Sequence, residues 1–126
     1  MAHARLLGEE HERTLRQANK YAACLLGAKH FEEAKLLLHR TLPVARRVLG
    51  KSAHFTLLMR TNYAKALYDD PTATLGDLRE ALTSLVETER TTRRVLGGTH
   101  PLMGAIGEYL QNARAALRTR ETPSPS

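Results

Sequence analysis

The chain of 126 residues contains no tryptophan, a single cysteine and only 5% aromatic residues. Because Cys24 is alone, neither an intrachain disulfide nor a cysteine-rich zinc site is possible, and one free thiol is consistent with a reducing compartment. The scarcity of aromatic rings argues against a protein that stacks nucleic-acid bases. No apolar run is long enough to span a bilayer, and acidic residues from position 9 argue against a secretory signal. We therefore expect a cytoplasmic protein without membrane contact.

Leucine and alanine dominate the hydrophobic 42% of the sequence, a mixture that suits helices packed through aliphatic and small side chains. The length is that of one domain with a modest core. The formal net charge is +6, but the arginines are spread along the chain and often stand near acidic residues. Because this pattern is typical of a solvated basic surface, we expect a protein or peptide partner of somewhat acidic character and no nucleic-acid partner.

The chain contains an internal repeat. The pentapeptide Arg-Arg-Val-Leu-Gly occurs at residues 46–50 and again at 93–97, and Leu-Gly at 7–8 is a shortened copy. When the sequence is aligned with itself at an offset of 42 residues, many residues of the first helix of each unit are identical. In the second helix of each unit the matching offset is 47 residues. Because insertions are tolerated best in turns, the change places a five-residue insertion at the turn around residues 69–71. The chain is therefore an array of similar units.

Apolar residues within each unit recur every three or four positions, which indicates amphipathic helices. Gly50 and Gly97 are expected to end helices in the left-handed conformation, after arginine pairs that favour a helix C-terminus. Pro101 suits a first helical turn, whereas Pro43 predicts a kink or a break. The sequence thus predicts an all-α fold of about five helices, at approximately residues 12–27, 30–48, 55–68, 75–96 and 101–119.

The repeated units share a series of short motifs. The first unit has Leu-Gly-Glu-Glu-His at 7–11, Thr-Leu at 14–15, Asn-Lys-Tyr-Ala at 19–22 and Phe-Glu-Glu-Ala at 31–34. The second repeats most of this order, and the third keeps Leu-Gly-Gly-Thr-His-Pro at 96–101. From about residue 5 to 117 the chain thereby resembles the tetratricopeptide repeat, in the roughly 42-residue variety of kinesin light chains. It departs from that pattern at Ala53, where a histidine is expected, and in keeping one asparagine of two per unit.

The resemblance implies a right-handed α-solenoid of helical hairpins and divides the chain into five parts. We expect residues 1–7 to end a partial preceding helix, and residues 8–50 to form the first repeat. Residues 51–97 form the second repeat with the five-residue turn insertion. Residues 98–119 are expected to be the first helix of a third, partial or capping repeat. The proline-containing segment 120–126 is expected to be a disordered tail.

The same resemblance implies a non-enzymatic protein-interaction scaffold, in which the first helix of each unit lines a concave face that binds a peptide segment. Asparagine amides would bond to the peptide backbone and lysines would attract acidic side chains. Carried over by position, the candidate binding residues are Asn19, Lys20, Ala23, Asn62, Lys65, Tyr109 and Asn112. Three alternatives remain open: these residues are merely solvated, the chain is a structural element that stacks end to end with identical or similar repeats, or it is a basic adaptor for nucleic acid.

The residues do not favour catalysis, a metal site or a cofactor. His11, His54 and His100 belong to successive units, and we expect the solenoid to separate them by about one repeat, too far for a shared metal ion. Cys24 matches Ala66 of the next unit, which predicts a buried and unreactive thiol. No glycine-rich phosphate loop is present.

Overall fold

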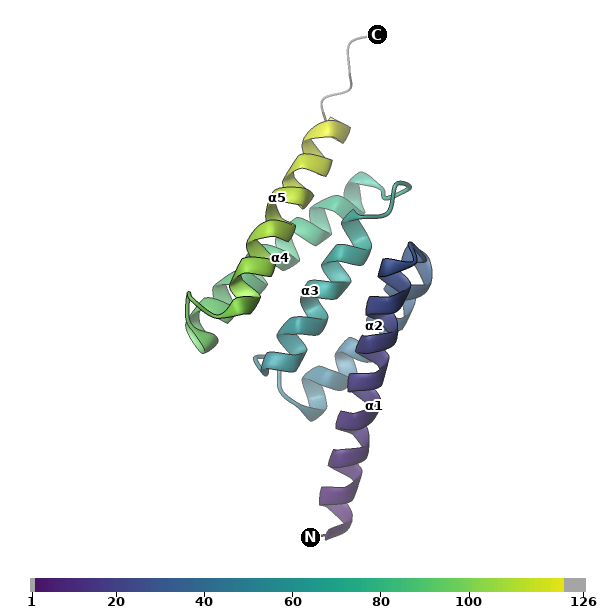
Figure 1. Ribbon diagram of the computed structural model, residues 1–126, viewed down its shortest axis with the longest axis vertical. Helices are drawn as coiled ribbons and strands as arrows, with labels where there is room; N and C mark the ends of the chain where they lie inside the picture. Colours follow the sequence, from purple (N-terminus) through teal and green to yellow (C-terminus); the bar gives the residue numbers. More distant parts are fainter. Residues whose placement is uncertain (1, 122–126) are drawn as a thin grey trace.

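The computed structural model describes residues 2–121 of the chain, and side chains from residue 11 onward. Within that range there is no strand. The helices are α1 (Ala2–Gly27), α2 (Phe31–Val48), α3 (His54–Tyr68), α4 (Leu75–Leu96) and α5 (Pro101–Glu121). The predicted all-α fold of five helices is confirmed. Figure 1 shows α1, α3 and α5 side by side in one layer, with α2 and α4 behind them.

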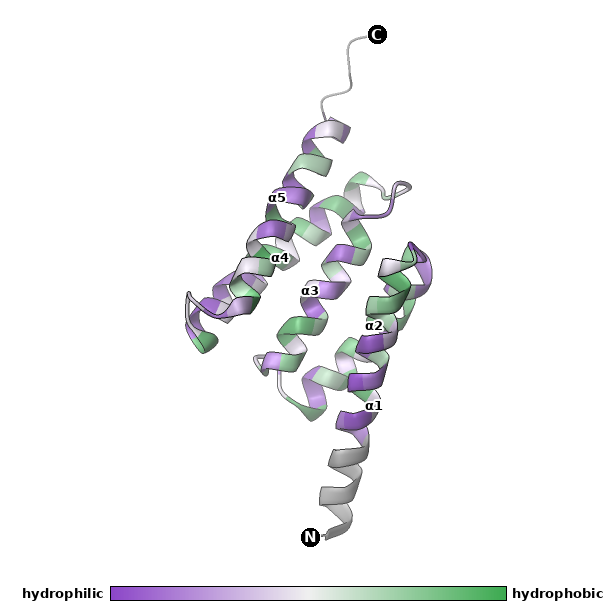
Figure 2. Ribbon diagram, in the orientation of Figure 1, coloured by the Kyte–Doolittle hydropathy of each residue, from purple (hydrophilic) through white to green (hydrophobic). Residues whose placement is uncertain are grey.

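Helix α3 is the centre of the packing, because it contacts all four other helices. Its buried residues accordingly lie on most of its circumference rather than on one stripe. One apolar cluster joins α3 to α4 and α5, and a second joins α3 to α1 and α2. Figure 2 shows hydrophobic and hydrophilic residues alternating along the helices, as expected when each has a buried and an exposed side.

The turn between the helices predicted at about residues 12–27 and 30–48 ends α1 in a hydrogen-bonded C-cap. The amide of His30 donates to the carbonyl of Leu25 at 2.8 Å, and the amide of Lys29 donates to Leu26 at 3.0 Å. These two bonds define a Schellman motif, in which the residue directly before the last hydrogen-bond donor takes a positive φ. That residue is Lys29, with φ of 65°, and not Gly27.

We expect Lys29→Gly to stabilise the fold by about 0.5–1 kcal/mol. A side chain in the left-handed region clashes with its own backbone, and glycine removes that cost at a C-cap. Chemical denaturation followed by circular dichroism would measure the change. Lys29→Ala is the matched control, because it removes the same charged side chain but keeps the Cβ atom at φ of 65°, and it should not stabilise the fold. A destabilising effect of Lys29→Gly would contradict the assigned cap.

The expected boundary near Gly8 is wrong, because α1 runs without interruption from Ala2 to Gly27. Residues 2–7 are therefore not the end of a separate preceding helix. Gly50 and Gly97 are followed by residues that leave the helix. Gly8 is instead followed by Glu-Glu-His-Glu-Arg, which contains mostly good helix formers and no proline. A glycine inside such a run is tolerated at modest cost, so the helix continues.

Gly50 and Gly97 end their units at positive φ, as predicted, and the arginine pairs occupy the preceding last turns of α2 and α4. Gly97 differs in detail, since its ψ of 155° lies outside the left-handed helical region and in one that is essentially restricted to glycine. The predicted break at Pro43 is wrong. Helix α2 continues through it to Val48, and the proline side chain is exposed.

Helix α5 is longer than expected, which corrects the start of the predicted tail. Arg120 and Glu121 are helical rather than disordered. Arg120 donates a hydrogen bond to the carbonyl of Ala73, and Glu121 pairs with Arg79 at 3.2 Å. Both contacts hold the last turn of α5 against the beginning of α4. Residues 122–126 of the predicted tail lie outside the described residues.

Candidate peptide-binding face

The candidate site lies on the layer of α1, α3 and α5, which we call the A face (Figure 1). These are the first helices of the three units. The face contains a cavity of about 530 Å³ near the C-terminal ends of α1 and α3. Four of the seven predicted binding residues line this cavity together: Ala23, Asn62, Lys65 and Tyr109. Three different helices supply them, so packing of neighbouring units creates the site.

Lys65 and Tyr109 form the link between α3 and α5 in this cavity. The Lys65 ammonium lies over the Tyr109 ring, 4.9 Å from its centroid, a cation–π geometry. The ammonium is also 3.8 Å from a carboxylate oxygen of Asp69. Lys29 also lines the cavity, so the lining contains two lysines and one aspartate. It therefore carries one excess positive charge beside an aromatic surface.

Asn19 has a role within the fold besides the predicted one. It is only 7% exposed, and its side-chain oxygen accepts a hydrogen bond of 3.0 Å from the amide nitrogen of Asn62. Its side-chain oxygen is therefore engaged within the fold, and its direct contact with a peptide stays a prediction. The bond joins α1 to α3 and orients the half-buried Asn62 at the cavity.

The remaining predicted residues, Lys20 and Asn112, are exposed but do not line the cavity. Asn112 stands near Tyr68, whose ring makes an edge contact with Tyr109 at 6.1 Å between centroids. The Tyr68 hydroxyl is buried and has no hydrogen-bond partner among the described residues. Burial raises the pKa of Tyr68, and it outweighs the opposing effect of Asn112. A neutral, desolvated hydroxyl thus lies beneath the A face.

We expect Tyr68→Phe to stabilise the protein by about 1 kcal/mol at neutral pH, because a buried hydroxyl without a partner has lost its hydration without compensation. In the wild type, the raised pKa of Tyr68 means that the unfolded chain ionises first as pH rises past 10.0. Stability should therefore be intact below pH 10 and fall above it.

Urea unfolding at a series of pH values would measure both effects. Tyr68→Phe should flatten the alkaline decline in part only, since burial also raises the pKa of Tyr63. Tyr21→Phe is the control, because that side chain is exposed. Loss of stability at pH 7 in Tyr68→Phe would mean that the hydroxyl has a stabilising partner.

The expected separation of the histidines is wrong for one pair. His54 and His100 lie at the N-terminal ends of α3 and α5, and the centroids of their rings are 5.1 Å apart. Neighbouring packed helices are only about 8–10 Å apart, so equivalent side chains at their ends can meet. His100 Nδ1 also accepts a hydrogen bond from the amide of Leu102. Across the described residues, no group of three histidine, cysteine or acidic side chains has a geometry suited to a metal ion.

Cys24 is exposed, contrary to the prediction of a buried thiol. Its counterpart Ala66 is 1% exposed, because the first unit covers it with Leu25, Leu26 and Ala34. Nothing equivalent covers the first unit among the described residues. The same comparison holds for Tyr21, which is 57% exposed, whereas Tyr63 is half-buried beside α2. We call this surface of α1 and α2 the outer edge of unit 1.

Sequence reasoning missed the turn residues that complete the A-face cavity. These are Leu26, Gly27, Lys29, Phe31, Asp69 and Pro71. They lie in or directly beside the turn between α1 and α2 and the turn between α3 and α4. The repeat places the two turns at equivalent positions of their units. Because equivalent turns of stacked units lie side by side, the sequence could have predicted that turn residues contribute to the cavity.

Comparison of the chain with protein-family models, with curated proteins and with solved structures found no match. No helix among the described residues is long and apolar enough to cross a membrane.

Proposed function

We propose that the chain is a tetratricopeptide-like interaction module that binds a peptide segment of another protein across the A face. The observation that carries the proposal is the convergence of Ala23, Asn62, Lys65 and Tyr109 on one cavity between three helices. An amide, a cation and an aromatic ring offer a peptide hydrogen bonds, charge attraction and contact area. The layered arrangement of the helices and the repeated motifs support the same proposal, as does the net charge of +6 for an acidic ligand. No catalysis and no cofactor are part of it, and a cytoplasmic location is proposed with it.

Selection of peptides from a random display library on the immobilised protein would test this function. The expected result is enrichment of acidic sequences that also contain apolar residues, with affinities that weaken as salt is added. A library that yields no sequence-specific binder would contradict the proposal. Capture of partners from a cell extract, followed by mass spectrometry, would then identify natural proteins that carry the selected sequence.

A second candidate function is assembly, in which the chain stacks end to end with identical or similar repeats. The outer edge of unit 1 favours it, because Tyr21 and Leu36 are each 57% exposed there. With Leu25 and Leu37 they line a shallow apolar depression. Sedimentation over a concentration series separates the two functions. Concentration-dependent oligomers that disappear in Tyr21→Ser with Leu36→Ser would support assembly, whereas a monomer at all concentrations would exclude self-stacking.

A further inference from the structure

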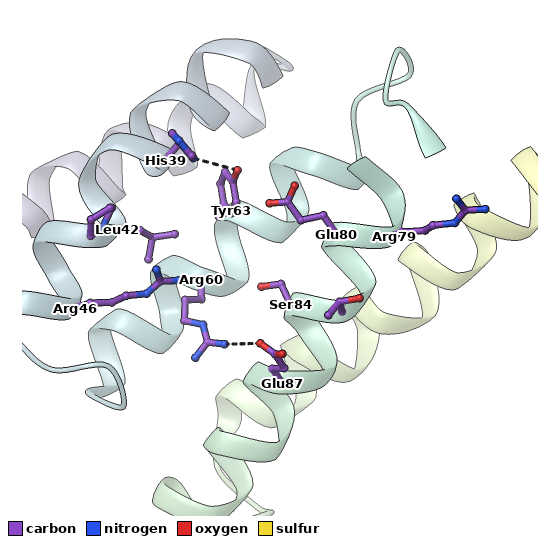
Figure 3. Close-up of a pocket in the computed structure, with 11 residues that line it drawn as sticks. His39, Leu42, Arg46, Arg60, Tyr63, Arg79, Glu80, Ser84 and Glu87 are labelled. Carbon is purple, nitrogen blue, oxygen red and sulfur yellow. Dashed lines mark hydrogen bonds and ion pairs between the residues drawn. The ribbon is translucent and has the colours of Figure 1, made fainter. Parts of the chain in front are cut away.

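The second layer of the molecule contains a separate opening. Among the described residues α2 and α4 do not contact one another, so the side of α3 between them is uncovered. The opening is a cavity of about 560 Å³, which we call the B pocket and which Figure 3 shows. Its polar lining includes His39, Arg46, Arg60, Tyr63, Ser84 and Glu87. It shares no lining residue with the A-face cavity, so ligand binding in the B pocket does not depend on the proposed function.

Arg60 is the unusual residue of the B pocket, because its charge is buried with little compensation. The residue is only 9% exposed, and its Nε has no hydrogen-bond partner among the described residues. Its ion pair is with Glu87 at 3.8 Å, beyond hydrogen-bond distance, and the Glu87 side chain is 62% exposed. A buried guanidinium is costly unless hydrogen bonds and an opposite charge satisfy it. The position matched by the 42-residue shift is Ala18, so the repeat itself does not require an arginine.

Arg46 adds a second guanidinium to the same opening. Figure 3 shows Arg46 on α2 and Arg60 on α3 reaching the space between α2 and α4. Burial lowers the pKa of Arg60, and the nearby charge of Arg46 lowers it further. Two neighbouring cations, one of them desolvated, favour a bound anion, and Glu80 and Glu87 of the same lining offset only part of this attraction because Glu87 is largely exposed. Arg79 also borders the pocket but pairs with Glu121 at 3.2 Å, and it points away in Figure 3.

We propose that the B pocket binds a carboxylate group, which Arg60 and Arg46 hold through charge-assisted hydrogen bonds in place of Glu87. A planar carboxylate matches the guanidinium fork and can accept two parallel hydrogen bonds. Glu80 and Glu87 also line the pocket, and they disfavour a dianion such as phosphate more than a singly charged group. The hydroxyl of Ser84 is a neutral donor at the same cavity, where the Tyr63 hydroxyl lies 3.5 Å from His39 Nδ1. The carboxylate comes either from a small organic acid or from an acidic side chain of a peptide.

Titration of the full chain with acetate, a singly charged carboxylate, followed by nuclear magnetic resonance, tests the site. We expect saturable shifts of the Arg60 Nε–H signal and of backbone amides near Ser84, at concentrations up to about 50 mM, where a Kd of ~10 mM is measurable. Inorganic phosphate should bind more weakly than acetate. A short blocked peptide with one glutamate, also singly charged, provides the second arm. If it binds more tightly than acetate, a peptide is the source of the carboxylate, and if more weakly, a small acid is.

Removing an arginine charge and removing the Glu87 charge are expected to change the binding affinity in opposite directions. Arg60→Gln and Arg46→Gln should each weaken acetate binding at least about tenfold, the usual effect of losing a charge-assisted hydrogen bond. Glu87→Gln should strengthen it several-fold, because it removes the carboxylate that competes for Arg60. Arg79→Gln is the matched control, and it should change binding less than about twofold.

The proposal is overturned if neither the wild type nor Glu87→Gln shows saturable binding. It is also overturned if Arg60→Gln or Arg46→Gln binds as tightly as the wild type. If Arg60→Gln does not fold, Arg46→Gln and Glu87→Gln still decide the matter, since both parent side chains are exposed.

Discussion

Leu38→Ala is expected to lower the free energy of unfolding by about 3 kcal/mol, whereas Leu36→Ala should change it by less than ~0.5 kcal/mol. Both residues lie on α2, two positions apart. Leu38 is fully buried in the cluster that joins α2 to Leu15 of α1 and Met59 of α3. Alanine at position 38 removes transfer energy and leaves a cavity in the contact between units. Leu36 faces outward at the outer edge of unit 1.

Urea denaturation followed by far-ultraviolet circular dichroism would measure both variants against the wild type. A domain of this size has roughly 5–15 kcal/mol of stability, so the loss expected for Leu38→Ala is a large fraction of the total. Equal effects of the two substitutions would mean that α2 is rotated about its axis relative to the structure. At high protein concentration, a loss of stability specific to Leu36→Ala would instead indicate self-stacking through the outer edge of unit 1.

Lys65→Ala combined with Tyr109→Ala is expected to weaken binding of a library-selected peptide by about 100-fold. Aromatic and charged residues in the centre of an interface commonly contribute 2 kcal/mol or more, and about 2.7 kcal/mol corresponds to this factor. The two side chains contact one another and connect α3 to α5 at the cavity. Their joint removal should therefore abolish both the charge attraction and the aromatic surface.

Fluorescence anisotropy with a labelled peptide would measure this loss. The control is Val86→Ala with Arg90→Ala, since both residues are exposed on α4, away from the A face. Circular dichroism checks that helicity is retained, because Tyr109 also packs against the apolar cluster of α3, α4 and α5. Unchanged peptide affinity in the folded double variant would contradict the assignment of the cavity as the binding site.

Much of the fold could be predicted because the repeat supplies the same signal more than once. The periodic apolar residues and the glycine-terminated helix ends predicted α2, α3 and α4 to within a residue or two. One error is the break predicted at Pro43, which α2 passes without interruption, and the others lie at the two ends of the array. Gly8 stands in a helix-forming run and does not end a helix, and Arg120 is held by a carbonyl more than forty residues away in sequence. Such tertiary contacts carry no local sequence signal.

The candidate site was predictable only in part, for a related reason. The repeat register predicted residues of α1, α3 and α5, four of which line one cavity, but the exposure of each side chain depends on what the neighbouring unit covers. Asn19 is buried by its bond to Asn62, and Cys24 is exposed because no earlier unit covers it among the described residues. Likewise, the equivalence of Arg60 with Ala18 gives no hint of a buried cation between two helices. The burial and exposure of these side chains depend on contacts between units, and the sequence pattern of a single repeat does not predict such contacts.

Peptide binding across the A face can be tested by mapping the amide chemical shifts of the chain with a saturating library-selected peptide. We expect the largest shifts to cluster on α1, α3 and α5 around Ala23, Asn62 and Tyr109, the residues of the A-face cavity. Shifts concentrated at the outer edge of unit 1, or in the B pocket, would contradict peptide binding at this face.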